Sequence, residues 1–252
     1  LMQFDLDGVW KWTSIIGENA SGGVCSISDM VLNPITQNII LAATYINTIS
    51  LNDASFTPVL NQTSLGVNNI IIFEYDKDGT PINLLQIGGT NNDTNARLDI
   101  IDTRLVVVGN YTSNPITLFN TDGSVGSVLN NSSIYTNIFM ALYDLDNVVS
   151  SKILNWSTAF ESFNNSCNVK KIQMASNTSI NILGTYSGTV KFNQTGSTPY
   201  VLGFDLLNTS NNLYTFVSQY TIDGIFNSRS YITTSTGNVV GNGLDVNTNN
   251  IF

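Results

Sequence analysis

Three pairs of aspartates in this sequence have a spacing that occurs in calcium-binding loops. The pairs are Asp5 and Asp7, Asp76 and Asp78, and Asp144 and Asp146. A calcium loop supplies about six to eight oxygen ligands and usually ends in a bidentate glutamate at its twelfth position. No glutamate occupies that position in any of the three copies. The pattern therefore favours hairpin turns, in which aspartate caps the backbone, and leaves a calcium-stabilised adhesin as the alternative.

Paired carboxylates could also hydrolyse glycosidic bonds, but glutamate is scarce in this chain. The glutamates are Glu18, Glu74 and Glu161, and the counterparts of Glu74 in later repeats are Leu142 and Gln219. The chain contains no histidine, which excludes metal sites and catalytic triads that need one. The sequence thus predicts neither a catalytic site nor a cofactor, and a carbohydrate-active enzyme or a lectin-like glycan-binding protein is the alternative.

The two cysteines, Cys25 and Cys167, precede Ile27 and Val169 by two residues each. We expect them at the same position of two non-adjacent repeats, with Ala96 in the repeat between, as small buried packing residues. The Cα atoms of equivalent positions in two non-adjacent repeats lie farther apart than the separation of about 7 Å that a disulfide permits. Two free thiols are predicted.

Composition narrows the classes of partner. Hydrophobic residues make up 42% of the 252 residues, charged residues only 11%, and asparagine occurs 35 times, so uncharged polar groups must keep the surface soluble. The net charge is −9, and without a basic cluster we expect neither nucleic acid nor an anionic membrane as a partner. No apolar run reaches the length of about 18 residues that a membrane-spanning helix requires.

An internal repeat organises the chain. An aromatic residue stands three places before an aspartate four times, at spacings of 71, 68 and 77 residues: Phe4, Tyr75, Tyr143 and Tyr220. An apolar run ending in tyrosine follows three of these markers, at residues 38–45, 104–111 and 180–186, and the fourth copy, 238–243, is abbreviated.

The apolar runs are short, rich in Val, Ile and aromatic residues, and bounded by Gly, Asn and Asp, which is typical of strands and turns. Each unit reads as strand, Asp-Gly hairpin, strand, loop, strand, turn, strand. The predicted units are residues 1–68, 69–136, 137–214 and 215–252. They predict an all-β fold: a single β-propeller or propeller segment of four antiparallel four-stranded blades, with the N- and C-terminal strands meeting in one blade.

Aromatic residues recur at the same positions of successive units. They are Trp10, Trp12, Tyr45, Tyr111 and Tyr186. Their recurrence favours packing in the core, with stacking on a sugar or peptide as the alternative.

These units resemble the SBBP-type β-propeller repeats of bacterial surface proteins and giant-virus proteins. The resemblance covers the whole chain and rests on Asp-Gly turns, tryptophans, Ile-Gly pairs and Gly-x-Tyr strands. The residues that carry it are Asp7-Gly8, Trp10, Trp12, Ile16-Gly17, Asp78-Gly79, Ile87-Gly88-Gly89, Gly109-Asn110-Tyr111 and Gly184-Thr185-Tyr186. The third unit departs from the pattern with Asn147 in place of glycine, and the fourth lacks its tyrosine. The resemblance implies a binding or structural surface and no conserved chemistry.

Asn-x-Ser/Thr sequons, the acceptors of N-linked glycans, are numerous. They lie at Asn19, Asn61, Asn92, Asn110, Asn130, Asn131, Asn155, Asn164, Asn177, Asn193 and Asn208. They are candidate glycosylation sites if the protein is extracellular, and otherwise part of an asparagine-rich surface.

The sequence therefore predicts a non-catalytic structural or interaction protein, a propeller displaying loops on a virion, a fibre or a cell surface. Loops on a rigid scaffold usually carry binding, and three long Asn/Ser/Thr-rich insertions suit that role: 50–69, 120–137 and 193–212. The expected partners are proteins in a larger assembly, with glycans as a further class.

Overall fold

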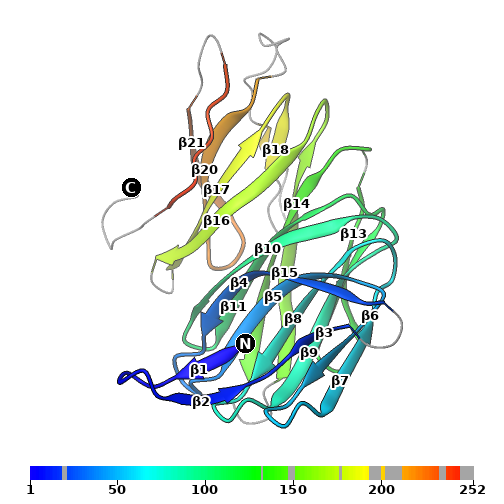
Figure 1. Cartoon of the computed structure of the whole chain (residues 1–252). Helices are drawn as coiled ribbons and strands as arrows, with labels where there is room; N and C mark the ends of the chain where they lie inside the picture. The colour runs from blue at the N-terminus through cyan, green and yellow to red at the C-terminus, as the bar shows by residue number, and fades with distance from the viewer. Residues whose placement is uncertain are drawn as a thin grey trace.

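The computed structural model contains only antiparallel β-sheets and connecting turns (Figure 1). It describes residues 1–18, 22–131, 133–146, 151–175, 178–192, 200–201, 212–232 and 237–244. No α-helix occurs among these residues, so the prediction of an all-β fold is confirmed.

Three four-stranded meanders share one strand order. Sheet I contains β4 (Val24–Leu32), β5 (Ile39–Ile46), β8 (Asn69–Tyr75) and β9 (Pro81–Gly88). Sheet II contains β10 (Asp93–Ile101), β11 (Arg104–Tyr111), β14 (Asn137–Asp146) and β15 (Ser151–Ser162). Sheet III contains β16 (Cys167–Ala175), β17 (Ser179–Tyr186), β20 (Tyr214–Thr221) and β21 (Phe226–Ile232). Each sheet thus takes its first two strands from one predicted unit and its last two from the next.

The N-terminus forms a two-stranded half-sheet of β1 (Met2–Phe4) and β2 (Trp10–Thr13). The pairing register shifts immediately before Phe4, as it does before Tyr75, Tyr143 and Tyr220 in the other sheets. The half-sheet therefore corresponds to the third and fourth strands of sheets I to III. The aromatic markers of the sequence occupy matching places.

A hairpin is inserted between the second and third strands of every sheet. The hairpins are β6 (Thr48–Asn52) with β7 (Pro58–Thr63), β12 (Ile116–Phe119) with β13 (Val125–Leu129), and β18 (Val190–Phe192) with β19 (Tyr200–Val201). Two of them pair with the last strand of the preceding sheet, β12 with β9 and β18 with β15. In the first, β6 pairs with β3 (Ile16–Glu18), which follows β2, and the three strands form a separate sheet. Residues 50–52, 58–63 and 125–129, expected in variable loops, thus belong to strands. Most of the third predicted insertion, 193–212, lies outside the described residues.

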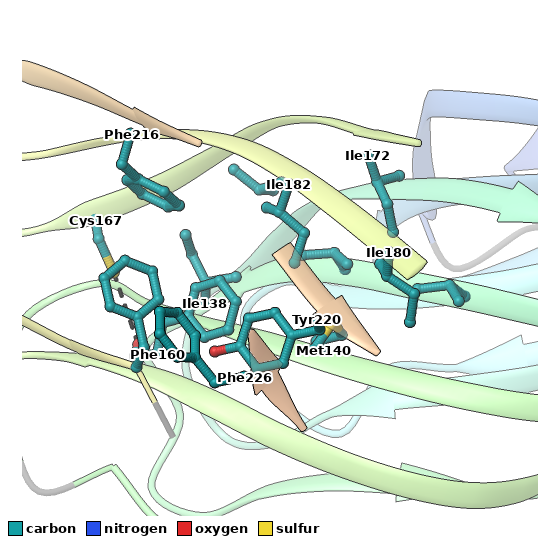
Figure 2. Close-up of a cluster of buried hydrophobic side chains, with 14 of the residues drawn as sticks. Ile138, Met140, Phe160, Cys167, Ile172, Ile180, Ile182, Phe216, Tyr220 and Phe226 are labelled. Carbon is teal, nitrogen blue, oxygen red and sulfur yellow. Dashed lines mark hydrogen bonds between the residues drawn. The ribbon is translucent and has the colours of Figure 1, made fainter. Parts of the chain in front are cut away.

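The sheets pack face to face, so the third strand of sheets I and II is buried on both sides. One core lies between sheets I and II, and a second lies between sheets II and III. Figure 2 shows the second core, where Ile138, Met140 and Phe160 of sheet II meet Ile182 and Phe216 of sheet III. A third core joins sheet I to the N-terminal segment through residues such as Phe73 and Tyr75.

The described sheets form a stack that does not close into a ring, so the four-blade propeller stays a prediction. Residues 245–252, expected to share a blade with the N-terminus, lie outside the described residues. Among the described residues, no helix is long and apolar enough to cross a membrane.

Candidate functional site

Two of the three aspartate pairs cap hairpin turns. One carboxylate oxygen of Asp5 accepts hydrogen bonds from the backbone N–H groups of Asp7 at 3.1 Å and Val9 at 2.8 Å. Asp76 does the same for Asp78 and Thr80, both at 2.9 Å. In the third pair, Asp144 accepts from the Asn155 amide at 2.6 Å. Nowhere in the described part of the chain do three His, Cys, Asp or Glu side chains gather as they would around a metal ion.

The half-sheet and the β8–β9 turn enclose a shallow pocket of about 520 Å³. Its lining residues are Gln3, Phe4, Asp5, Lys11, Trp12, Ala54, Lys77 and Asp78. The charged groups are already paired, because Lys11 lies 2.9 Å from Asp5 and Lys77 lies 2.7 Å from Asp78. The lysine at position 11 is the principal reason that the pKa of Asp5 is lowered.

Trp12 in this pocket is a packing residue. Its indole N–H donates to the Lys77 carbonyl at 2.8 Å, and its ring stacks on Tyr75 at a centroid distance of 6.3 Å. Tyr45, Tyr111 and Tyr186 are also buried, which confirms their expected role in the core. Trp10, in contrast, is exposed. Because Trp12 is covered, the pocket offers a sugar only Phe4 as a stacking surface.

A buried ion pair joins sheets I and II, and sequence reasoning missed it. The Lys152 ammonium of β15 donates to the Glu74 carboxylate of β8 and to the Asn83 side chain. Glu74 also accepts from the amides of Asn38 at 2.7 Å and Asn83 at 3.0 Å. Burial lowers the pKa of Lys152, while the neighbouring Glu74 acts in the opposite direction. The two charges are 78 residues apart in sequence, so no local motif could have revealed the pair.

The cysteines occupy equivalent positions, as expected, but only Cys167 is fully buried and Cys25 is half-buried. Cys25 pairs with Tyr45 in sheet I, and Cys167 pairs with Tyr186 in sheet III. Both thiols are free. Burial raises the pKa of Cys25 to about 11 and that of Cys167 to about 12. In sheet II the register places Asp93, not Ala96, at this position, opposite Tyr111.

Asp93 is a buried carboxylate that fastens the start of sheet II. It accepts hydrogen bonds from the backbone N–H groups of Gly89, Thr112 and Ser113 and, at 2.6 Å, from the Ser113 hydroxyl. Burial raises its pKa, and these hydrogen bonds oppose the shift. These hydrogen-bond donors belong to the adjoining backbone and side chains of the fold, so the role of Asp93 is structural.

The sequons differ in accessibility. Among the described ones, five asparagines are exposed: Asn61, Asn92, Asn130, Asn155 and Asn164. Asn110 and Asn131 are buried, and the Asn110 amide is hydrogen-bonded to Asn168 and Val169 in sheet III. A glycan on either buried amide would require it to leave its partners. Asn19, Asn177, Asn193 and Asn208 lie outside the described residues.

Exposed apolar side chains are concentrated near the N-terminus. Eleven of the twenty-five large exposed hydrophobic residues fall within the first 35 residues. Four of them lie on β4: Val24, Ile27, Met30 and Leu32. The last three share one side of the strand and are here named the β4 face. This face points away from sheet II, because the intervening Asp29 accepts a hydrogen bond from the Leu98 N–H of sheet II at 3.0 Å.

Most of the corresponding positions in the other sheets are buried. Met30 is 56% exposed, whereas its counterparts by register, Leu98 in sheet II and Ile172 in sheet III, are 2% and 1% exposed. Leu32 is 52% exposed, its sheet II counterpart Ile100 is half-buried, and its sheet III counterpart Met174 is 8% exposed. Sheets II and III each have a preceding four-stranded sheet to cover these positions, and sheet I has only the half-sheet. The β4 face is therefore a core-type surface without a cover among the described residues.

Comparison with known proteins assigns the chain to no family. No protein-family model matches the chain, and none of the curated proteins is similar to it. The candidate site therefore rests on geometry, and the β4 face is the strongest candidate interface. Its position could not be predicted from the sequence, because its apolar residues are typical of any buried strand.

Proposed function

We propose that this protein is a non-catalytic structural or interaction protein that binds a partner protein through the β4 face. The observation that carries the proposal is the exposure of Met30 at a position that is buried in both other sheets, together with the exposure of Ile27 and Leu32 beside it. Removing apolar surface of this kind from water contributes about 25 cal/mol per Å² to association. Exposed apolar clusters on a stable scaffold commonly mark protein-binding sites.

The chemistry of the remaining groups supports a binding role. The aspartates of the turns cap backbone N–H groups, the pocket charges are paired with each other, and the Glu74–Lys152 pair is sealed between two sheets. None of these arrangements presents an unpaired acid and base to a substrate, as glycoside hydrolysis requires.

The place of action that we propose is the surface of a virion, a fibre or a cell, within a propeller-like array of sheets. The resemblance to SBBP-type repeats supports it, as do the exposed sequons at Asn61, Asn92, Asn130, Asn155 and Asn164. The low content of charged residues, 11%, suits a protein packed closely against others.

A comparison of three immobilised proteins tests the proposal: the wild type, Met30→Lys and Ile153→Lys. Ile153 on β15 is a matched control, since it is 57% exposed and Met30 is 56% exposed. Each is exposed to an extract of the cells that produce the protein, and the bound proteins, including further copies of the chain, are quantified by mass spectrometry. We expect at least one protein to bind the wild type and Ile153→Lys but not Met30→Lys. Identical bound sets for all three would refute the proposed function.

A further inference from the structure

Three side chains that could react with one another meet where β15 approaches sheet I. They are the Lys152 amine, the Asn83 carboxamide and the Glu74 carboxylate. Glu74 and Asn83 are direct cross-strand partners on β8 and β9, so their side chains share one face of sheet I. Lys152 belongs to β15 of sheet II and contacts Asn83 across 69 residues of sequence. A nucleophilic amine, a carboxamide and an acid that carries protons are the components of a transamidation.

The amine lies close to the carbon atom that it would attack. Lys152 Nζ is 2.6 Å from Asn83 Oδ1. Because a C=O bond is about 1.2 Å long, Nζ is no more than about 3.8 Å from the Asn83 Cγ. Reacting atoms in a near-attack arrangement are about 3–3.5 Å apart, so a small movement brings the two atoms to that distance.

One oxygen of Glu74 contacts both the nitrogen that must lose protons and the nitrogen that must gain them. Glu74 Oε2 accepts a hydrogen bond from Lys152 Nζ and another, at 3.0 Å, from Asn83 Nδ2. The second carboxylate oxygen, Oε1, accepts from the Asn38 amide at 2.7 Å, which orients the carboxylate. Glu74 is therefore placed to take a proton from the amine and to deliver it to the departing amide nitrogen, as a general acid-base catalyst does.

The backbone holds Lys152 in this position, and its side chain is sealed from water. The Lys152 N–H donates to the Thr121 hydroxyl at 2.8 Å, and the Lys152 carbonyl accepts from the Thr121 N–H at 3.2 Å. Thr121 lies in the turn between β12 and β13, which belong to the same sheet as β9. The side chains of Lys152 and Glu74 are 0% and 3% exposed. Burial lowers the pKa of Lys152 against the influence of Glu74, and this favours the neutral, nucleophilic amine.

We propose that Lys152 and Asn83 form an intramolecular isopeptide bond, with Glu74 as the acid-base catalyst. Glu74 takes a proton from the Lys152 ammonium, and the neutral amine attacks the Asn83 Cγ. Glu74 then delivers this proton to Nδ2, the Cγ–Nδ2 bond breaks, and ammonia leaves. Nζ loses its second proton to Glu74, from which the ammonia carries it away as ammonium. The lysine ammonium and the carboxamide thus become a secondary amide and an ammonium ion, with no oxidant or reductant, and Glu74 returns to its starting state.

This inference goes beyond the proposed function and uses no residue of the β4 face. The reaction occurs once in each chain and acts on no external substrate, so it is compatible with a structural protein. The newly folded chain contains the ion pair, and the bond replaces it, joining β9 of sheet I covalently to β15 of sheet II. Unfolding measurements on freshly folded protein therefore report on the pair, and later ones on the bond.

Intact-mass spectrometry of the full chain tests the proposal. The protein is produced in bacteria, incubated in the folded state, and unfolded immediately before the measurement. Its mass is expected to fall below the mass of the sequence by one ammonia, about 17 Da. Trypsin is expected to release peptide 78–97 joined to peptide 105–170, which stays uncut after Lys152 because that amine is blocked. Protein kept in urea from synthesis onward is expected to retain its full mass.

Three variants separate the roles of the residues. Lys152→Arg keeps the positive charge but lacks the amine, and it is expected to retain its full mass. Glu74→Gln cannot carry the proton, and it is expected to form the bond at least about a hundredfold more slowly. Lys191→Arg is the matched control, because Lys191 also pairs with a glutamate, Glu161, at 3.5 Å, and it is expected to lose ammonia as the wild type does. Near-ultraviolet circular dichroism checks that each variant is folded.

The wild type alone can overturn the inference, even if a variant fails to fold. A folded wild type that retains the full mass of its sequence contradicts the bond. So does a loss of ammonia that maps to another residue, such as a succinimide at Asn242-Gly243. A folded Glu74→Gln that forms the bond at the wild-type rate refutes the role of Glu74. Binding through the β4 face is measured separately with Met30→Lys, so failure of the bond and failure of the proposed function are distinguishable.

Discussion

At the scale of single residues, the buried charged side chains stabilise the arrangement of the sheets. Glu74 and Lys152 are both buried and join two sheets, and Asp93 gathers N–H donors where sheet II begins. Burying a charge without its partner is costly because the surrounding protein replaces water poorly. The role of these groups is therefore to hold the sheets in place.

The Glu74–Lys152 pair provides a test of this role. Lys152→Met leaves the Glu74 carboxylate buried beside neutral amides, and we expect a loss of about 3–5 kcal/mol in the free energy of unfolding. The double variant Glu74→Leu/Lys152→Met should recover most of that loss, since no unpaired charge remains. Urea denaturation measures both values. Lys77→Met, which removes a fully exposed pair, serves as the control and should leave the midpoint unchanged; equal losses at positions 77 and 152 would contradict the argument.

The cysteine thiols should be nearly inert in the folded protein. A pKa raised to about 11 at Cys25 and about 12 at Cys167 leaves at most about a thousandth of either group as the reactive thiolate at pH 8. We expect a disulfide reagent to label neither at an appreciable rate at pH 8, and to label both as soon as urea unfolds the chain. Absorbance of the released thiolate follows the reaction, and rapid labelling of the native protein would show that burial does not control these thiols.

At the scale of elements, the Gly-x-Tyr strands follow one rule: their glycine lies opposite a phenylalanine of the paired strand. Gly109 lies opposite Phe139, and Gly184 lies opposite Phe216. A Cβ at Gly109 would stand 2.6 Å from the Phe139 ring. At the same position of sheet I, Ala43 lies opposite Ile71. Glycine is needed where the facing residue is phenylalanine, because the ring lies over the glycine backbone.

This rule predicts the effect of exchanging the pair. Gly109→Ala forces the Phe139 ring out of its place, and we expect a loss of about 1–3 kcal/mol in unfolding free energy. Adding Phe139→Ile recreates the pair of sheet I and should restore part of the loss. Thermal and urea unfolding of the two variants check this expectation. A double variant no more stable than Gly109→Ala would show that the pair does not act as a unit.

The inserted hairpins belong to the same scale, and their pairing could not be predicted. Residues 50–69 and 120–137 are polar and were expected in display loops. Instead β12–β13 extend sheet I beyond β9, and β6–β7 pair with β3 in a three-stranded sheet. A polar strand at a sheet edge needs only backbone partners, so its side chains carry little information about its pairing. Each hairpin thereby ties one sheet to the sheet before it.

At the scale of the whole molecule, the stack has a protected centre and an exposed end. Sheet II is covered on both faces, whereas the half-sheet is thin and the β4 face is open. Stability in stacked repeats is approximately the sum of unit and neighbour terms, so the end units open first.

Hydrogen exchange checks this gradient. In conditions where the protein is monomeric, we expect the slowest exchange in β11 and β14 and the fastest in β1 and β2, because local opening is easiest where fewest apolar contacts are lost. Exchange followed by mass spectrometry resolves these strands. Uniform exchange across the chain would argue against a stack of separable sheets.

The sequence by itself determined the class of fold, the strand-turn rhythm, the aromatic positions and the free thiols. These features follow from local patterns: alternating apolar runs, Asp-Gly turns, and residues that recur with the repeat. Only the tertiary structure decided that Glu74 meets Lys152, that Asp93 stands where the cysteines do in other sheets, that polar insertions become edge strands, and that β4 is left uncovered. These features depend on which sheet lies next to which, because a side chain is buried only where a neighbouring sheet covers it. Apolar residues at equivalent positions, such as Met30 of β4 and Leu98 of β10, are therefore exposed in one sheet and buried in the next.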